Sequence, residues 1–125
     1  MAARLWPVLF HPLCEQELHH VSAAVQDELL AMAKLLEQTG PELGRPWADT
    51  LNGSQHSQMK ELRFRADGGV WRVAFAFDPH RAAILLIAAD KRGQNERRFY
   101  RRFITAADQR FNEHLAGLSE AGDTQ

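Results

Sequence analysis

The chain has 125 residues, of which 45% are hydrophobic and 25% charged, values that are typical of one compact soluble domain and exclude extensive disorder. No apolar run approaches the ~20 residues of a membrane-spanning helix, and the N-terminus lacks the apolar core of a secretory signal, so we expect a cytoplasmic protein without membrane partners. Cys14 is the only cysteine, which excludes an internal disulfide and indicates a small buried side chain rather than a nucleophile.

The net charge of −1 hides an uneven distribution along the chain. Residues 60–110 hold twelve lysines and arginines against six acids, a balance of +6, which leaves −7 for the remainder. This asymmetry indicates a surface for an anionic partner, although a solvated charged helix and basic residues at strand edges would give the same balance. Arginine outnumbers lysine in the basic half, which favours phosphate binding, because guanidinium groups form paired hydrogen bonds with phosphate.

The N-terminal third predicts a short strand followed by helices. Leu5–Phe10 is an apolar run of strand length that could extend a sheet. Over Leu13–Gln38, apolar residues recur every three or four positions, as on the buried face of a helix. Ser22 is a candidate N-cap within this stretch, so we expect a short and a long helix that form a hairpin and end near Gly40.

Residues 41–58 are polar and rich in turn-forming residues, and we expect a long loop that leads into a sheet. Trp47 lies in this loop, where it either covers the core as a lid or offers a stacking surface, and we favour the lid. His56 could exchange protons near neutral pH, but an ordinary loop histidine is the simpler interpretation.

Residues 59–90 predict an antiparallel meander of three strands, because short strand-like runs are separated by Asp-Gly-Gly and Asp-Pro turns. In the second strand, Arg72 shares its face with Ala74 and Ala76. The small alanines leave space beside the arginine, where a phosphate would fit. A salt bridge from Arg72 to Glu61, or to another acid on a neighbouring strand, is the alternative interpretation.

The last third predicts helix. Gln94–Phe103 is a basic helical segment, and Thr105–Asp108 resembles a capping box at which the helix would kink or a new helix would begin. An apolar stripe continues to Leu118. We expect residues 119–125 to form a frayed tail, so that residues 1–118 make up the single domain.

Motifs for common cofactors and metals are missing from the sequence. It contains no glycine-rich phosphate loop, no CxxC pair and no GxSxG nucleophile elbow, and its six histidines show no convincing zinc spacing. We therefore expect no cofactor and no metal.

Six stretches between residues 44 and 115 instead carry a family resemblance by their order and spacing. They are Gly44-Arg45-Pro46, Leu51-Asn52-Gly53-Ser54, Lys60–Phe64, Trp71–Pro79, Asp90–Gly93 and Arg98-Phe99-Tyr100. With these stretches the chain resembles the RelE/ParE superfamily of toxins from type II toxin–antitoxin systems, in its phage-derived HigB-like branch. The resemblance implies an α+β fold, with a helical hairpin on one face of a small antiparallel sheet, a C-terminal helix, and an RNA-binding cleft on the opposite, concave face.

The resemblance also implies partners and a set of site residues. RelE-like members cleave mRNA in the ribosomal A site without a metal, and a cognate antitoxin, here expected to be a small helix-turn-helix protein encoded next to the toxin, neutralises them. Carried over by position, the catalytic set comprises Arg72, Arg63, Lys60, Lys91 and Tyr100, and the chemistry of the reaction adds Glu61. The residues expected to bind RNA are Arg65, Arg92, Arg97 and Arg98.

Cleavage by attack of the 2′-hydroxyl needs a base, positive charge on the phosphorane and an acid for the 5′-oxygen. Arg72 and Arg63 would supply charge. Glu61 is the natural base unless it only pairs with an arginine, in which case a lysine or a tyrosine of lowered pKa must serve. Tyr100 could instead be a buried anchor of its helix. Lys60 stands directly beside Glu61, whereas RelE has two alternating lysines on this strand, so the identity of the base stays open.

Two other functions are compatible with the same pattern. One is a ParE-like toxin that poisons DNA gyrase through protein contacts, and the other is a nucleic-acid-binding domain without toxic action. The basic cluster favours the ribonuclease over the gyrase poison.

Overall fold

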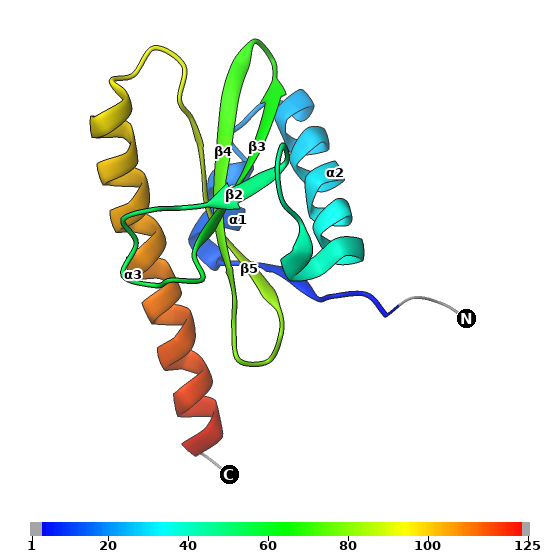
Figure 1. Cartoon of the computed structure of the whole chain (residues 1–125), viewed down its shortest axis with the longest axis vertical. Coiled ribbons are helices and arrows are strands. Elements are labelled where there is room, and N and C mark those ends of the chain that lie inside the picture. The colour runs from blue at the N-terminus through cyan, green and yellow to red at the C-terminus, as the bar shows by residue number, and fades with distance from the viewer. Residues whose placement is uncertain (1–3, 124–125) are drawn as a thin grey trace.

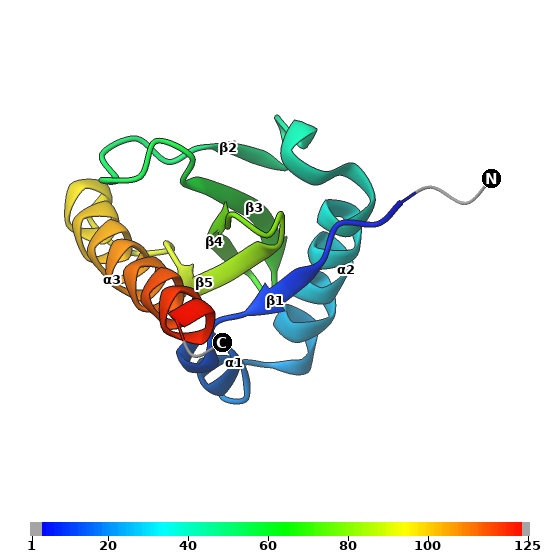
Figure 2. The same ribbon diagram turned by 90° about the horizontal axis from the view of Figure 1, so that it is seen from below.

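The computed structural model describes residues 4–123 and has a mixed sheet between helices (Figure 1, Figure 2). In chain order the elements are β1 (Val8–Phe10), α1 (Pro12–Leu18), α2 (Ala23–Thr39), the 3₁₀ turn η1 (Gly40–Glu42), β2 (Ala48–Thr50), β3 (Lys60–Ala66), β4 (Gly69–Phe77), β5 (Ala83–Asp90) and α3 (Glu96–Asp123). The five strands lie in the order β1-β5-β4-β3-β2. None of the helices within residues 4–123 is both long enough and apolar enough to cross a membrane.

The predicted meander is confirmed, because β3, β4 and β5 pair antiparallel in sequence order. β1 adds a parallel strand beside β5, and β2 pairs antiparallel with β3 at the opposite edge. The prediction of an unbroken loop over residues 41–58 is wrong at β2. Ala48 explains the difference, since it is fully buried and lies opposite Leu62 in the ladder, so this segment joins the sheet through a non-local contact.

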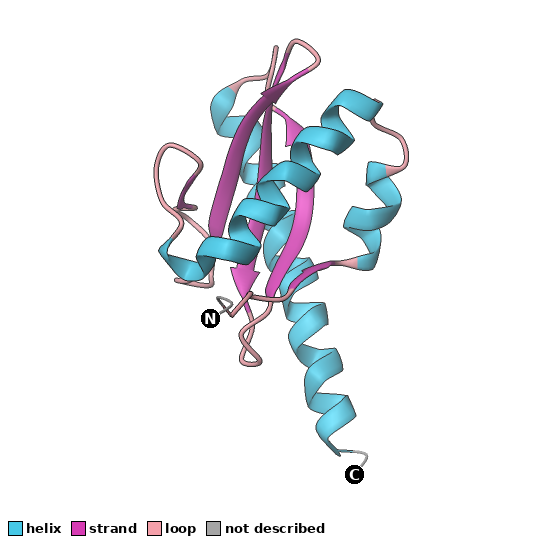
Figure 3. Ribbon diagram, turned by 90° about the vertical axis from the view of Figure 1, so that its right-hand side faces the viewer, coloured by secondary structure: helices cyan, strands magenta, loops and turns pink. Residues whose placement is uncertain are grey.

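One face of the sheet is covered by the helical hairpin, as predicted, and α2 crosses the strands diagonally in Figure 3. The Ser22 hydroxyl accepts a hydrogen bond from the backbone N–H of Val25 (3.3 Å), which confirms the predicted N-cap. α2 ends at Gly40, whose φ of 68° and contact with the Trp6 indole leave no room for a Cβ atom. Cys14 is fully buried in the same core, as expected.

The opposite face, where the resemblance places the RNA-binding cleft, is covered in part by α3 (Figure 2). Phe99, Phe103 and Phe111 are buried in one cluster with Ala74 and Ala76. The space that we expected beside the two alanines for a phosphate is therefore part of a hydrophobic core. The sequence shows small residues and aromatic residues separately, but only the packed structure shows that one set fills the space left by the other.

α3 runs without interruption from Glu96 to Asp123, so the predicted break at residues 105–108 is wrong. The Thr105 hydroxyl donates to the carbonyl of Arg101 (2.8 Å), a bond within the helix, and therefore does not cap a new one. The helix also includes residues 119–123 of the predicted frayed tail, whose last residues, 124–125, lie outside the described residues.

Candidate functional site

Four of the predicted catalytic residues come together where β3 and β4 meet the first turns of α3. Glu61 and Arg63 lie two positions apart on β3 and therefore project from the same face. Arg72 on β4 is the direct cross-strand partner of Arg63. Tyr100 reaches this face from α3, and its hydroxyl joins the cluster. The structure thus gathers residues from three elements into one polar group, which we call the arginine cluster: Glu61, Arg63, Arg72 and Tyr100.

A single carboxylate oxygen holds this cluster together. Oε1 of Glu61 accepts hydrogen bonds from Nε of Arg63 (3.0 Å) and from the hydroxyl of Tyr100 (3.0 Å). The same oxygen lies 3.6 Å from Nε of Arg72, which donates to the Tyr100 oxygen (3.1 Å). The Glu61 carboxylate therefore neighbours both guanidinium groups, Tyr100 links them, and Asp49 of β2 adds a second negative charge beside Arg63 (3.4 Å).

Glu61 lies behind the arginines and not at the surface, with 1% of the residue exposed. Its second oxygen, Oε2, is buried and has no hydrogen-bond partner among residues 4–123. A buried carboxylate is stable only with counter-charges and donors around it, which Arg63 and Arg72 supply. The alternative that the sequence left open, Glu61 as the ion-pair partner of arginines, is the arrangement that the structure contains.

Tyr100 does not have the lowered pKa that a tyrosine base would need. Burial raises its pKa, and although the hydrogen bond from Arg72 lowers it, the negative charge of Glu61 raises it further, so that the net pKa lies above the ordinary value. The phenol therefore keeps its proton at neutral pH and donates it to Glu61.

Arg72 uses one edge of its guanidinium group for support and keeps the other edge for a ligand, whereas Arg63 also donates from Nη2 to Asp49 of β2 (3.4 Å). Both Nε atoms are engaged inside the cluster. The Nη atoms of Arg72 make no hydrogen bond to any other residue within 4–123, and 15% of its side chain is exposed, against 36% for Arg63. Both residues border a groove of about 320 Å³, which we call the arginine groove and which is lined by Pro46, Trp47, Arg63, Phe64, Arg65, Val70 and Arg72.

Two residues of this region were missed or misread in the sequence. Asp49 on β2 accepts hydrogen bonds from Arg45 (3.0 Å) and Arg63 (3.4 Å), and nothing marked it because its strand was expected to be loop. Trp47 was expected to cover the core, but it is 48% exposed and lines the arginine groove. Alternation along the chain explains the error, since the neighbouring Ala48 is the residue that faces the core.

The remaining predicted residues lie outside the cluster. Lys60 donates to the carbonyl of Pro41 (2.8 Å) and so points away from it. Lys91 pairs with Glu96 (2.8 Å) and lies 5.8 Å from the centre of the Tyr100 ring, at the border of the cluster. Of the four expected RNA-binding arginines, Arg65 borders the arginine groove, Arg92 bonds to the carbonyl of Gly68 (2.9 Å) near the β3–β4 turn, and Arg97 and Arg98 are exposed at the start of α3.

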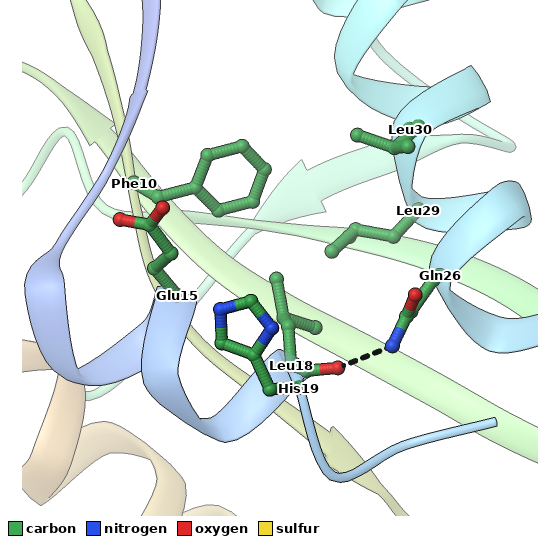
Figure 4. Close-up of a pocket in the computed structure, with 7 residues that line it drawn as sticks. All are labelled: Phe10, Glu15, Leu18, His19, Gln26, Leu29 and Leu30. Atoms are coloured by element: carbon green, nitrogen blue, oxygen red, sulfur yellow. Dashed lines mark hydrogen bonds between the residues drawn. The ribbon is translucent and has the colours of Figure 1, made fainter. Parts of the chain in front are cut away.

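Among the described residues, His56 and a pocket beside α1 lack the paired charged groups of the arginine cluster. His56 bonds to Asn112 (2.8 Å) and packs edge-on against Phe111, contacts that suit an ordinary loop histidine. A pocket of about 200 Å³ lies between α1, α2 and β1 (Figure 4). There Gln26 donates to the carbonyl of Leu18 (2.8 Å), and leucine and phenylalanine side chains form much of the lining.

Comparisons with known proteins match most of this sequence to one family and its fold to one solved structure. Residues 16–112 match the family described as "Phage derived protein Gp49-like (DUF891)". Two Mycobacterium tuberculosis proteins are similar. The chain is 47% identical to "Putative toxin HigB2" over 93 residues, which are 74% of this chain and 46% of that protein. It is 41% identical to "Putative toxin HigB3" over 115 residues, which are 92% of this chain and 98% of that protein.

The matched region therefore spans about half of HigB2 and nearly all of HigB3. Among solved structures, a mutant of the E. coli toxin RelE in the free state superposes with a TM-score of 0.59 at 10% identity, covering 81% of this chain and 95% of that one. A likeness at this identity is one of fold, and it confirms the predicted α+β architecture. The chain belongs to the phage-derived Gp49-like family, is similar to the two HigB toxins and shares the fold of RelE.

Proposed function

We propose that this toxin is an endoribonuclease that cleaves mRNA on the ribosome and is neutralised by an antitoxin. The observation that carries the proposal is the cross-strand pair Arg63–Arg72, whose Nε edges are fixed by Glu61 and Tyr100 while both side chains border the arginine groove. Two guanidinium groups held in this way suit a phosphate that gains negative charge in the transition state.

The geometry also supports a path for the proton. In the proposed reaction the 2′-oxygen of the RNA bonds to the adjacent phosphorus, and the bond from phosphorus to the 5′-oxygen breaks. The 2′-hydroxyl passes its proton to the Tyr100 oxygen as Tyr100 passes its own to Glu61, which is the counter-ion of the arginines at rest and the proton acceptor in the reaction. Lys91, 5.8 Å from the Tyr100 ring, is the nearby acid for the 5′-oxygen.

The experiment is to induce the toxin in cells and map mRNA 5′ ends during growth arrest. We expect new 5′ ends within translated codons for the wild type and for Lys34→Ala, which removes an exposed cation from α2, on the far face of the sheet. Arg72→Ala should produce few such ends. Co-expression of the neighbouring reading frame should restore growth.

Cleaved chromosomal DNA without new mRNA ends would replace this proposal by gyrase poisoning, the other activity compatible with the superfamily. The arginine groove favours the ribonuclease, because three cations beside one another suit a polyanion.

A further inference from the structure

Trp47 is a large aromatic side chain held outward by a fixed backbone. Its carbonyl accepts a hydrogen bond from the N–H of Arg63 (2.8 Å), and its own N–H donates to the carbonyl of Gly44 (3.1 Å). β2 begins at the next residue, Ala48, which is fully buried. Trp47 is 48% exposed although its backbone is anchored to the sheet. An exposed tryptophan on a rigid support loses little conformational entropy when a flat ligand binds against it.

The surroundings of Trp47 determine which ligand would bind. The arginine groove places the indole next to Arg63, Arg65 and Arg72. Its volume of about 320 Å³ lies at the lower end of the ~300–1,000 Å³ typical of ligand sites. An aromatic platform beside several guanidinium groups is the combination that holds single-stranded nucleic acid, in which the ring stacks on a base and the cations bind phosphates. An apolar protein segment would bury those cations without counter-charge, which is costly.

We propose that Trp47 forms a stacking subsite for one unpaired RNA base, next to the phosphate held by Arg63 and Arg72. The subsite extends the proposed ribonuclease function and rests on it. Trp47, just before β2, is joined by a backbone hydrogen bond to Arg63 on β3, so the base on the indole belongs to a nucleotide adjoining the bound phosphate. Stacking tolerates any base but requires that one be present.

A double-mutant cycle between protein and RNA tests the subsite. The full chain is titrated with short single-stranded oligonucleotides in which 2′-O-methyl groups prevent cleavage, and each nucleotide in turn is made abasic while its phosphate is kept. For the wild type, one abasic position should weaken binding by roughly 5- to 150-fold, the range for a lost base–aromatic stack. Trp47→Ala should bind the intact RNA as weakly as the wild type binds the abasic RNA, and removing the base at the same position should weaken this variant no further. Trp47→Tyr should keep most of the affinity for the intact RNA.

Two matched variants separate stacking from charge and from misfolding. Arg65→Ala should weaken all oligonucleotides equally and reduce the salt slope by about 1, whereas Trp47→Ala should leave that slope unchanged. Leu30 is an exposed apolar residue on α2, and Leu30→Ala should change neither the affinity for the oligonucleotides nor the salt slope. Thermal melts of all variants check that each is folded.

The outcomes distinguish the subsite from the function on which it rests. If toxin-dependent mRNA ends appear in cells but no abasic position is coupled to Trp47, the subsite is wrong and the ribonuclease stands. If no mRNA ends appear, the ribonuclease is wrong, and the oligonucleotide cycle alone decides the subsite. If Trp47→Ala binds RNA like the wild type but loses the co-expressed antitoxin, Trp47 is a protein contact and the proposal is overturned.

Discussion

Arg63 and Arg72 lie directly opposite each other on β3 and β4, a placement in which like charges repel. The pair is stable because Glu61 bonds to Arg63 at 3.0 Å and lies 3.6 Å from Arg72. Glu61 is one residue before Leu62 on β3 and therefore emerges on the face of the arginines and not among the apolar residues of the helical hairpin. The position of this carboxylate is what allows two cations to share one side of the sheet.

Replacing Glu61 with glutamine should destabilise the protein and misplace both arginines. The amide keeps the volume but removes the charge that balances Arg63 and Arg72. We expect a loss of about 2 kcal/mol in the free energy of unfolding, below the ~3–5 kcal/mol of a fully buried broken pair because both arginines keep contact with solvent. Urea unfolding of Glu61→Gln and wild type measures this loss in the free energy of unfolding. Glu96→Gln, which removes the exposed partner of Lys91, is the control and should leave the unfolding curve unchanged. Equal midpoints for Glu61→Gln and wild type would contradict the role of Glu61 as counter-ion.

Tyr100 provides a spectroscopic test because it is the only tyrosine in the chain. Burial and the charge of Glu61 raise its pKa, so the absorbance change of tyrosinate should have its midpoint above the ~10 of model peptides. A raised pKa in the folded state stabilises the protein below the unfolded pKa, and this contribution is lost as pH rises through the folded pKa. The free energy of unfolding should therefore fall more steeply at alkaline pH for the wild type than for Tyr100→Phe. A midpoint at or below the model-peptide value would refute the raised pKa.

Sequence patterns predicted the parts of the fold that depend on local spacing. The meander follows from alternation and turn residues, and the helical hairpin from a repeat of three and four with Ser22 as its cap. β2 and the uninterrupted α3 were missed because both depend on contacts between distant segments. β2 is a strand only because β3 pairs with it, and the cap-like residues after Phe103 remain helical within a helix that packs on the sheet.

The sequence predicted most residues of the candidate site but not the role of each. The resemblance supplied Arg63, Arg72 and Tyr100, and the structure brings these residues together. It could not assign Glu61, because the choice between a base and a counter-ion depends on burial, which becomes visible only when α3 is in place. Trp47 was misread for a related reason: the face of a residue is undefined until its segment is known to be a strand edge.

Cys14 should be unreactive while the protein is folded. Burial raises the pKa of its thiol to about 12, the charge of Glu17 adds to the shift, and Arg110 opposes it in part. The thiolate is the reactive form, so at pH near 8 a thiol reagent should label the folded protein only as fast as the chain unfolds. Mass spectrometry over time measures the rate, and protein in denaturant, which should react at once, is the control. Rapid labelling without denaturant would show that Cys14 is accessible.

Asp78 should make the stability depend on acid pH. Burial alone would raise its pKa, but hydrogen bonds from His114 and from the backbone N–H groups of Ala82 and His80 lower it, so that the net pKa lies below the ordinary value. A lowered pKa gives stability that is present above the unfolded pKa of about 3.9 and is lost as pH falls through the folded pKa. Asp78→Asn should thus be less stable than the wild type near neutral pH, and the difference should vanish in strong acid. Urea unfolding across this pH range measures the difference in the free energy of unfolding between the two proteins. A difference that stays constant with pH would contradict the role of the Asp78 charge.

Arg72 is the residue whose replacement best separates structure from catalysis. Arg72→Ala removes the hydrogen bond from Nε to Tyr100 and one of the two arginine counter-charges of Glu61, while Glu61 keeps its bonds to Arg63 and Tyr100. We therefore expect a folded variant that loses about 2 kcal/mol of stability. Arg72 borders the arginine groove, and loss of one contact to the phosphorane should lower the cleavage rate on the order of 10²-fold. Arg72→Lys should recover part of this rate, because an ammonium restores the charge but not the paired geometry. Growth arrest, mRNA 5′ ends and melting temperature are measured together for the three proteins. If Arg72→Ala melts normally and still arrests growth as the wild type does, the guanidinium has no catalytic role; if it melts far lower, the salt bridge to Glu61 is its main function.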